Sequence, residues 1–148
     1  MASKLRFAAV VAAMSVACGD SPTAPDPTIN DLRRAPLTVT IDGTGVGLQT
    51  SLWRNLMPSV PPSGSPLLAT IRLSGAVTSA SIDYLWVLFG DETWAVTPER
   101  LAGTSDWIAR GGPQWTPGSR VDVVARVRTN DRRTQLVRAA DQVIEAAY

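Results

Sequence analysis

The sequence contains no histidine and a single cysteine, Cys18, among its 148 residues. Without histidine it lacks the commonest general base, the commonest neutral metal ligand and the usual charge switch near neutral pH. One cysteine excludes an intramolecular disulfide and a cysteine metal cluster. We therefore expect a fold that is held by its hydrophobic core, with no metal site and no cofactor.

Charge is also scarce, since charged residues make up 18% of the chain and the formal net charge is +1. Two of the basic residues, Lys4 and Arg6, lie near the N-terminus. Without them, 12 arginines face 13 acidic residues, so the remainder of the chain is close to neutral. A near-neutral domain has no electrostatic basis for binding nucleic acid, and we expect none as a partner.

The N-terminal segment has the composition of a secretory signal peptide. Lys4 and Arg6 precede an apolar run at residues 7–16, and the small Ala17 follows it. Ten residues rise only about 15 Å as a helix, whereas a bilayer core is about 30 Å thick. Residues 1–17 are therefore predicted to direct export and to be removed.

Residues 15–18, Ser-Val-Ala-Cys, resemble the lipobox of bacterial lipoproteins, although Ser15 stands where that family usually has an aliphatic residue. The resemblance implies that Cys18 carries a diacylglyceryl group, becomes the mature N-terminus and anchors the protein to a membrane of the cell envelope. Gly19, in place of aspartate, favours the outer membrane over the inner one. The alternative is an ordinary secretory signal with an incidental cysteine.

Residues 18–36 comprise the cysteine and a polar segment rich in proline, with few apolar side chains to bury. This composition predicts a disordered linker, or tether, between Cys18 and a folded domain over residues 37–148.

The domain shows the period-two alternation of half-buried β-strands. Residues 82–89 (IDYLWVLF) are almost all apolar, as in a strand buried on both faces between packed sheets. Residues 134–144 are predicted as a last strand with a bulge near Ala139 and Ala140, and a helix over residues 141–145 is the alternative. The other alternating segments are residues 37–41, 46–53, 67–73, 93–97, 107–110 and 121–128.

About seven short strands separated by turn residues predict an all-β, antiparallel β-sandwich. Pro117-Gly118, followed by the alternating valines of residues 121–127, resembles the approach to a late strand in immunoglobulin-like domains. The chain as a whole resembles small envelope lipoproteins that carry such domains and have no assigned function.

The five tryptophans are the most unusual residues of the composition. Trp86 is predicted to be core between the sheets, and Trp53 and Trp94 to pack rather than bind. Trp107 and Trp115 flank a loop and form a candidate binding surface, because tryptophan is frequent at binding hot spots. A hydrophobic plug at one end of the sandwich is the alternative for that pair.

The second candidate surface is the proline-rich loop at residues 57–66, which includes Pro61 and Pro62. Such a loop is stiff enough to present a surface to a partner. A rigid crossover between the sheets is the alternative.

The acidic residues show no spacing that would bring two carboxylates together in a cleft, so no enzymatic activity is predicted. A hydrolase that uses carboxylates alone is the least favoured hypothesis. The sequence predicts a membrane-tethered, non-catalytic lipoprotein that acts as an interaction or accessory module for an unidentified envelope protein. The alternative is a ligand-binding domain, for glycans or as a protease inhibitor, that uses the proline-rich loop or Trp107 and Trp115. The oligomeric state is left open.

Overall fold

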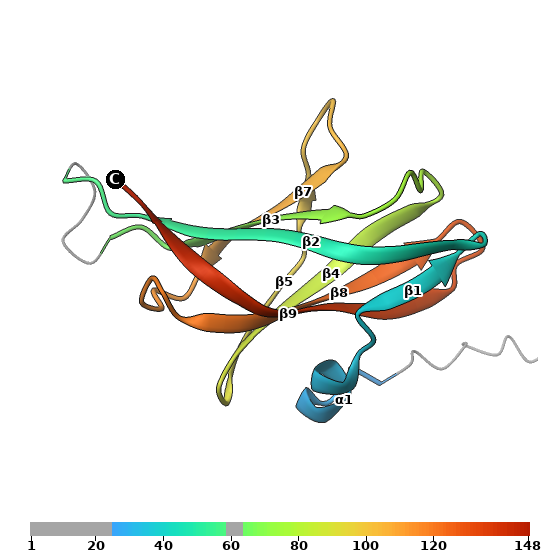
Figure 1. Ribbon diagram of the computed structural model, residues 1–148, viewed down its shortest axis with the longest axis horizontal. Helices are drawn as coiled ribbons and strands as arrows, with labels where there is room; N and C mark the ends of the chain where they lie inside the picture. The colour runs from blue at the N-terminus through green and yellow to red at the C-terminus, as the bar shows by residue number, and fades with distance from the viewer. Residues whose placement is uncertain (1–24, 59–63) are drawn as a thin grey trace, which may run out of the picture.

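The computed structural model describes residues 25–58 and 64–148, and the predictions for residues 1–17, Cys18, Pro61 and Pro62 lie outside the described residues. The fold is all-β with one short helix (Figure 1). In chain order the elements are α1 (Ile29–Arg34), β1 (Thr38–Ile41), β2 (Thr44–Asn55), β3 (Leu67–Leu73), β4 (Ala80–Phe89), β5 (Glu92–Val96), β6 (Glu99–Arg100), β7 (Asp106–Gly112), β8 (Arg120–Thr129) and β9 (Thr134–Ala147). No helix within this described part of the chain has the length and hydrophobicity needed to span a bilayer.

The nine strands of the described residues form one sheet in the order β5-β4-β8-β9-β2-β3-β7-β6, with β1 attached to β2. The sheet curls around a single main core, which takes Leu52 and Ile71 from one half and Val87 and Val123 from the other. Eight of these strands lie on the segments predicted from alternation, and β6 lies outside all of them.

The sheet is mixed, so the prediction of a purely antiparallel fold is wrong. Strands β2 and β9 pair in parallel, with Leu52 opposite Ile144 and Asn55 opposite Ala147. Alternation of apolar residues indicates that each segment is a strand, but it carries no information about the direction of the neighbouring strand. From this paired end the two strands diverge, and Figure 1 shows β1 in the opening between them.

Strand β9 continues to Ala147, so the helix considered for residues 141–145 is wrong and the predicted bulge is confirmed. The register against β8 shifts between Val121 and Val123, whose partners are Gln142 and Ala139. Asp141 lies in the shifted segment with φ 58°, and its backbone N–H donates to Asp122 at 2.9 Å. The extra residue lets one strand serve both halves of the curled sheet.

The helix α1 lies where the sequence predicts a disordered linker. That prediction is therefore wrong for residues 29–36, which are part of the folded domain. Thr28 caps the helix in a capping box with Asp31, which satisfies backbone N–H groups that the first turn leaves unpaired. Leu32 and Ala35 are buried against Trp86, Leu88 and Val124. A capped turn with one large buried side chain is too short to stand out from a linker by composition.

The helix also explains the apolar run at residues 82–89. Leu85 and Val87 face the main core, whereas Trp86 and Leu88 belong to the second cluster beneath α1. The strand is buried on both faces, as predicted, but Trp86 packs against the helix and not between sheets.

Candidate interaction face

Trp107 and Trp115 are both buried, with 6% and 7% of their surface exposed. Trp107 lies near the start of β7, and the guanidinium of Arg100 is 5.3 Å from its ring centroid. Trp115 follows the end of that strand and donates from its indole nitrogen to Glu92 at 2.8 Å. Five residues of strand, about 17 Å, separate Trp107 from Gly112. The structure therefore does not bring the two tryptophans together, and neither ring presents an open face.

The carboxylates of the described strands mostly pair with arginines on neighbouring strands. Asp83 on β4 lies 2.8 Å from Arg126 and 2.6 Å from Arg128, both on β8. Asp122 similarly lies 2.9 Å from Arg138 on β9. Within residues 25–58 and 64–148, no group of three acidic, histidine or cysteine side chains is placed to hold a metal ion. These carboxylates have structural partners across the sheet.

Arg54 is a buried arginine that the sequence does not reveal, with 5% of its surface exposed. Its Nε donates to the carbonyl of Ser65 at 2.9 Å, and its Nη1 donates to the carbonyls of Gln114 and Trp115 at 3.0 Å each. The Gln114 side chain donates in turn to the carbonyl of Gly64. Arg54 thus links the segment after β7 to the segment before β3 through hydrogen bonds to both. The only sequence signal for the burial of Arg54 is its position two residues after Leu52, on the inward side of an alternating strand.

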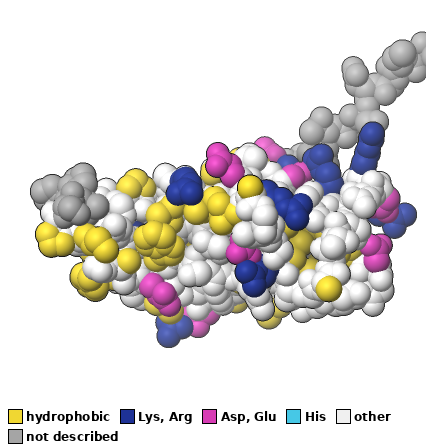
Figure 2. Space-filling view, turned by 90° about the horizontal axis from the view of Figure 1, so that it is seen from above, with side chains coloured by type: hydrophobic (Ala, Val, Ile, Leu, Met, Phe, Trp, Pro, Cys, Tyr) yellow, Lys and Arg dark blue, Asp and Glu magenta, His cyan; other side chains and the backbone are white. Residues whose placement is uncertain are grey.

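Hydrophobic side chains gather on the outer surface formed by β9, β2, β3 and β7. Trp53, Leu68 and Ile108 are half-buried there, and Val143 is 42% exposed. These four residues are called the apolar face below. Figure 2 shows hydrophobic side chains concentrated in the left half of the surface seen from above. The sequence predicts Trp53 as a packing residue, but the structure places it at the centre of this surface.

The register explains why the apolar face is continuous. Trp53 pairs with Leu68, and Thr70 pairs with Ile108 on the next strand. Successive side chains on a strand point to opposite sides, so these residues share the side that faces away from the core. Met57, 42% exposed, and Tyr148, 84% exposed, follow the ends of β2 and β9 and add apolar surface near one end of the face.

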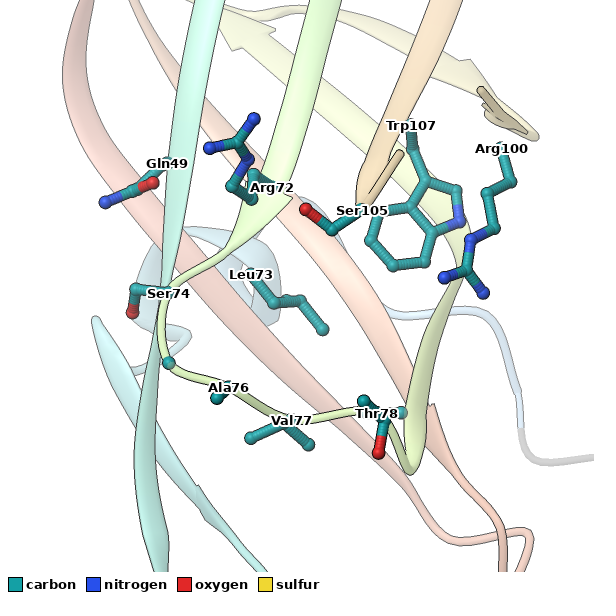
Figure 3. Close-up of a pocket in the computed structure, with 12 residues that line it drawn as sticks. Gln49, Arg72, Leu73, Ser74, Ala76, Val77, Thr78, Arg100, Ser105 and Trp107 are labelled. Carbon is teal, nitrogen blue, oxygen red and sulfur yellow. The ribbon is translucent and has the colours of Figure 1, made fainter. Parts of the chain in front are cut away.

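A separate pocket of about 300 Å³ opens at the other end of β3 (Figure 3). Its lining combines two arginines, Trp107 and several polar side chains with the aliphatic side chains of Leu73, Ala76, Val77 and Ala80. Arg72 forms a bidentate pair with Asp106 at 2.5 and 3.0 Å. The hydrogen bond from Arg72 lowers the pKa of Asp106, and the carboxylate raises the pKa of Arg72. Arg100 lies over Trp107 instead, so the pocket presents cationic and hydrogen-bonding groups suited to a small polar ligand.

The comparisons with known proteins give no assignment, since no protein-family model matches the chain and no curated protein matches it either.

Proposed function

We propose that this chain is an exported lipoprotein whose folded domain is a non-catalytic protein-interaction module. The lipobox-like residues 15–18 support an anchor at Cys18, and Gly19 after it favours the outer membrane over the inner one. The observation that carries the interaction role is the apolar face, because partly exposed hydrophobic side chains gathered on one surface of a folded protein mark binding surfaces. Its partner is a protein that presents apolar surface of its own.

An immunoglobulin-like arrangement is part of this proposal. The neighbours β2-β3-β7-β6 follow the A-B-E-D order of one sheet in such domains, and β5-β4-β8-β9 follow the C′-C-F-G order of the other. Strand β2 would join the two sheets through its parallel pairing with β9. Trp86 and the missing disulfide depart from antibody domains, in which a tryptophan and two cysteines share the core.

The composition of the surface supports a protein partner. Trp53 lies between Leu68 on β3 and Glu145 on β9, and the charged Glu145 and Arg110 lie at the two edges of the same surface. An apolar centre that contains an aromatic residue, with a polar rim, is the usual composition of protein interfaces.

Site-specific photo-cross-linking of the full chain in intact cells tests this function. A photoreactive residue at Leu68 is expected to give a reproducible protein adduct, and one at the exposed Ser81 of β4 serves as the matched control. Absence of any protein adduct at position 68, or equal adducts at both positions, would overturn the proposal.

The pocket at Arg100 and Trp107 favours a second candidate, in which the domain binds a glycan or another small polar ligand. Shifts of the Trp107 indole N–H signal in nuclear magnetic resonance spectra, on addition of oligosaccharides, would support it. An unchanged signal across a carbohydrate panel would exclude that class of ligand.

A further inference from the structure

The side chains of the apolar face are arranged so that β9 and β2 mirror β7 and β3. In one row across the four strands, Glu145 lies beside Trp53, and Trp53 lies beside Leu68. Leu67 pairs with Gly112 and Ala69 with Ala109, so Leu68 faces the intervening residues of β7, where Arg110 is exposed. The row therefore reads acidic, apolar, apolar, basic from one edge to the other.

The adjacent row has the same kind of symmetry. Ser51 pairs with Thr70, and Thr70 pairs with Ile108. Val143 lies between Ile144, the partner of Leu52, and Gln142, whose side-chain oxygen accepts from the Thr50 hydroxyl at 2.7 Å, so Val143 lies near Ser51 on the outward side. This row reads apolar, hydroxyl, hydroxyl, apolar.

We propose that the apolar face binds the same face of a second copy of this chain, across a twofold axis that runs along the strands between β2 and β3. This inference rests on the proposed function and names its partner. The rotation exchanges β9 with β7 and β2 with β3, as an isologous interface requires. It sets Glu145 opposite Arg110 of the second copy and Trp53 opposite Leu68 of the second copy.

The second row is matched by the same rotation. Val143 meets Ile108 of the second copy, and Ser51 meets Thr70 of the second copy. Each of these contacts occurs twice, once on either side of the axis. Neither Glu145 nor Arg110 forms an ion pair with another residue of the described chain, so both charges are available.

The geometry is that of two aligned sheets, which pack face to face about 10 Å apart. Strands β2, β3 and β7 run side by side for about six residues, and β9 adds about four residues beside β2. At about 4.8 Å between strands and about 3.3 Å per residue, this surface covers roughly 350 Å² in projection. A standard interface buries about 800 Å² on each partner, so this face predicts a weak dimer. Anchors in one membrane would favour it by confining both copies to the same surface.

Cross-linking of the full chain in intact cells tests the symmetry. In the dimer, the two copies of Ser51 are offset by about 4.8 Å across the strands and by about 10 Å between the sheets. The distance between them is therefore about 11 Å. With a short bismaleimide, Ser51→Cys is expected to give a cross-linked dimer. The parent chain and Ser81→Cys, on another part of the fold, are the controls. A dimer yield at position 51 no higher than in these controls would overturn the proposal.

Charge reversal tests the facing residues. Two variants are made in the Ser51→Cys chain, one with Glu145→Arg and the other with Arg110→Glu. Each variant places like charges opposite each other at both edges of the interface. Each is expected to lower the dimer yield about fivefold. Both positions are exposed, so both variants should fold. Co-expression of the two variants pairs opposite charges at both edges and is expected to restore cross-links between differently tagged copies. Failure of the mixture to recover, while each variant alone is impaired, would overturn the twofold arrangement.

The outcomes separate this inference from the proposed function. An adduct from position 51 to a different protein only would overturn the dimer and leave the interaction module standing. If position 51 gives no adduct with any protein and position 68 gives none either, both proposals fail.

Discussion

Arg54 shows how a single buried side chain organises one end of the fold. Its guanidinium reaches three backbone carbonyls on two separate segments, before β3 and after β7. Hydrogen bonds from a charged group are about twice as strong as neutral ones. The residue therefore holds these two segments together beside the buried Trp115 and Leu67.

Replacement of Arg54 by alanine should lower the free energy of unfolding by about 3 kcal/mol, because the carbonyls lose a charged donor in a buried place. Urea unfolding followed by tryptophan fluorescence measures this change. Arg110→Ala removes an exposed arginine and is the matched control, expected within about 0.5 kcal/mol of the parent. Equal stability of the two variants would show that Arg54 does not have this role.

Acid should weaken the fold through two hydrogen-bonded carboxylates, those of Asp106 and Asp31. The pKa of Asp106 is lowered by its hydrogen bond with Arg72, and the pKa of Asp31 is lowered by the hydroxyl and backbone N–H of Thr28. Each group stabilises the fold fully above the ordinary value of 3.8 and ceases to do so as the pH falls through its folded pKa.

The unfolding midpoint is therefore expected to fall as the pH drops below about 4, and to fall less in Asp106→Asn than in the parent. Thermal unfolding across this range measures the difference. Parallel pH curves for the two proteins would contradict the assignment to Asp106.

The helix α1 gives the sheet a second buried cluster, and Leu32 is its central side chain, 2% exposed. Leu32→Ala should destabilise the protein by about 2–4 kcal/mol, because a buried leucine is lost and the cover over Trp86 is weakened. Arg34→Ala, at an exposed position of the same helix, is expected to have little effect. Chemical unfolding measures both, and a red-shifted tryptophan emission should accompany the loss of Leu32. A stability unchanged by Leu32→Ala would show that the helix does not hold this face.

A strand could be predicted from the sequence where one of its faces is buried in the core and the other is exposed to solvent. Residues 67–73 form a strand whose alternate residues are buried, and residues 121–128 lie within β8. The parallel pairing of β2 with β9 could not be predicted from the sequence. It joins segments from opposite ends of the domain and depends on how the sheet curls. The helix could not be predicted because its six residues include too few apolar side chains to show a period.

The apolar face could not be predicted for a related reason. Trp53, Leu68, Ile108 and Val143 belong to four different strands, and each stands alone among polar neighbours on its outward side. Only the register brings them together. Trp107 and Trp115 are close in sequence, but most of strand β7 lies between them and holds them apart.

The full chain is expected to depend on Cys18 for its place in the cell. Cys18→Ser should move the protein from the membrane fraction to the soluble fraction, because acyl chains on that thiol supply the anchor. Cell fractionation, with mass spectrometry of the N-terminal peptide, measures both location and lipid. A parent protein whose N-terminal peptide is unlipidated would contradict the proposed anchor.

Covalent footprinting tests the interaction surface most directly. The full chain is labelled with a carbene reagent in intact cells and again after purification and dilution, and the modified residues are compared. We predict that labelling of Trp53, Leu68, Ile108 and Val143 falls in cells, while labelling of Ser81 stays the same. Equal labelling of the apolar face in both states would contradict the proposal that this surface is covered by a partner.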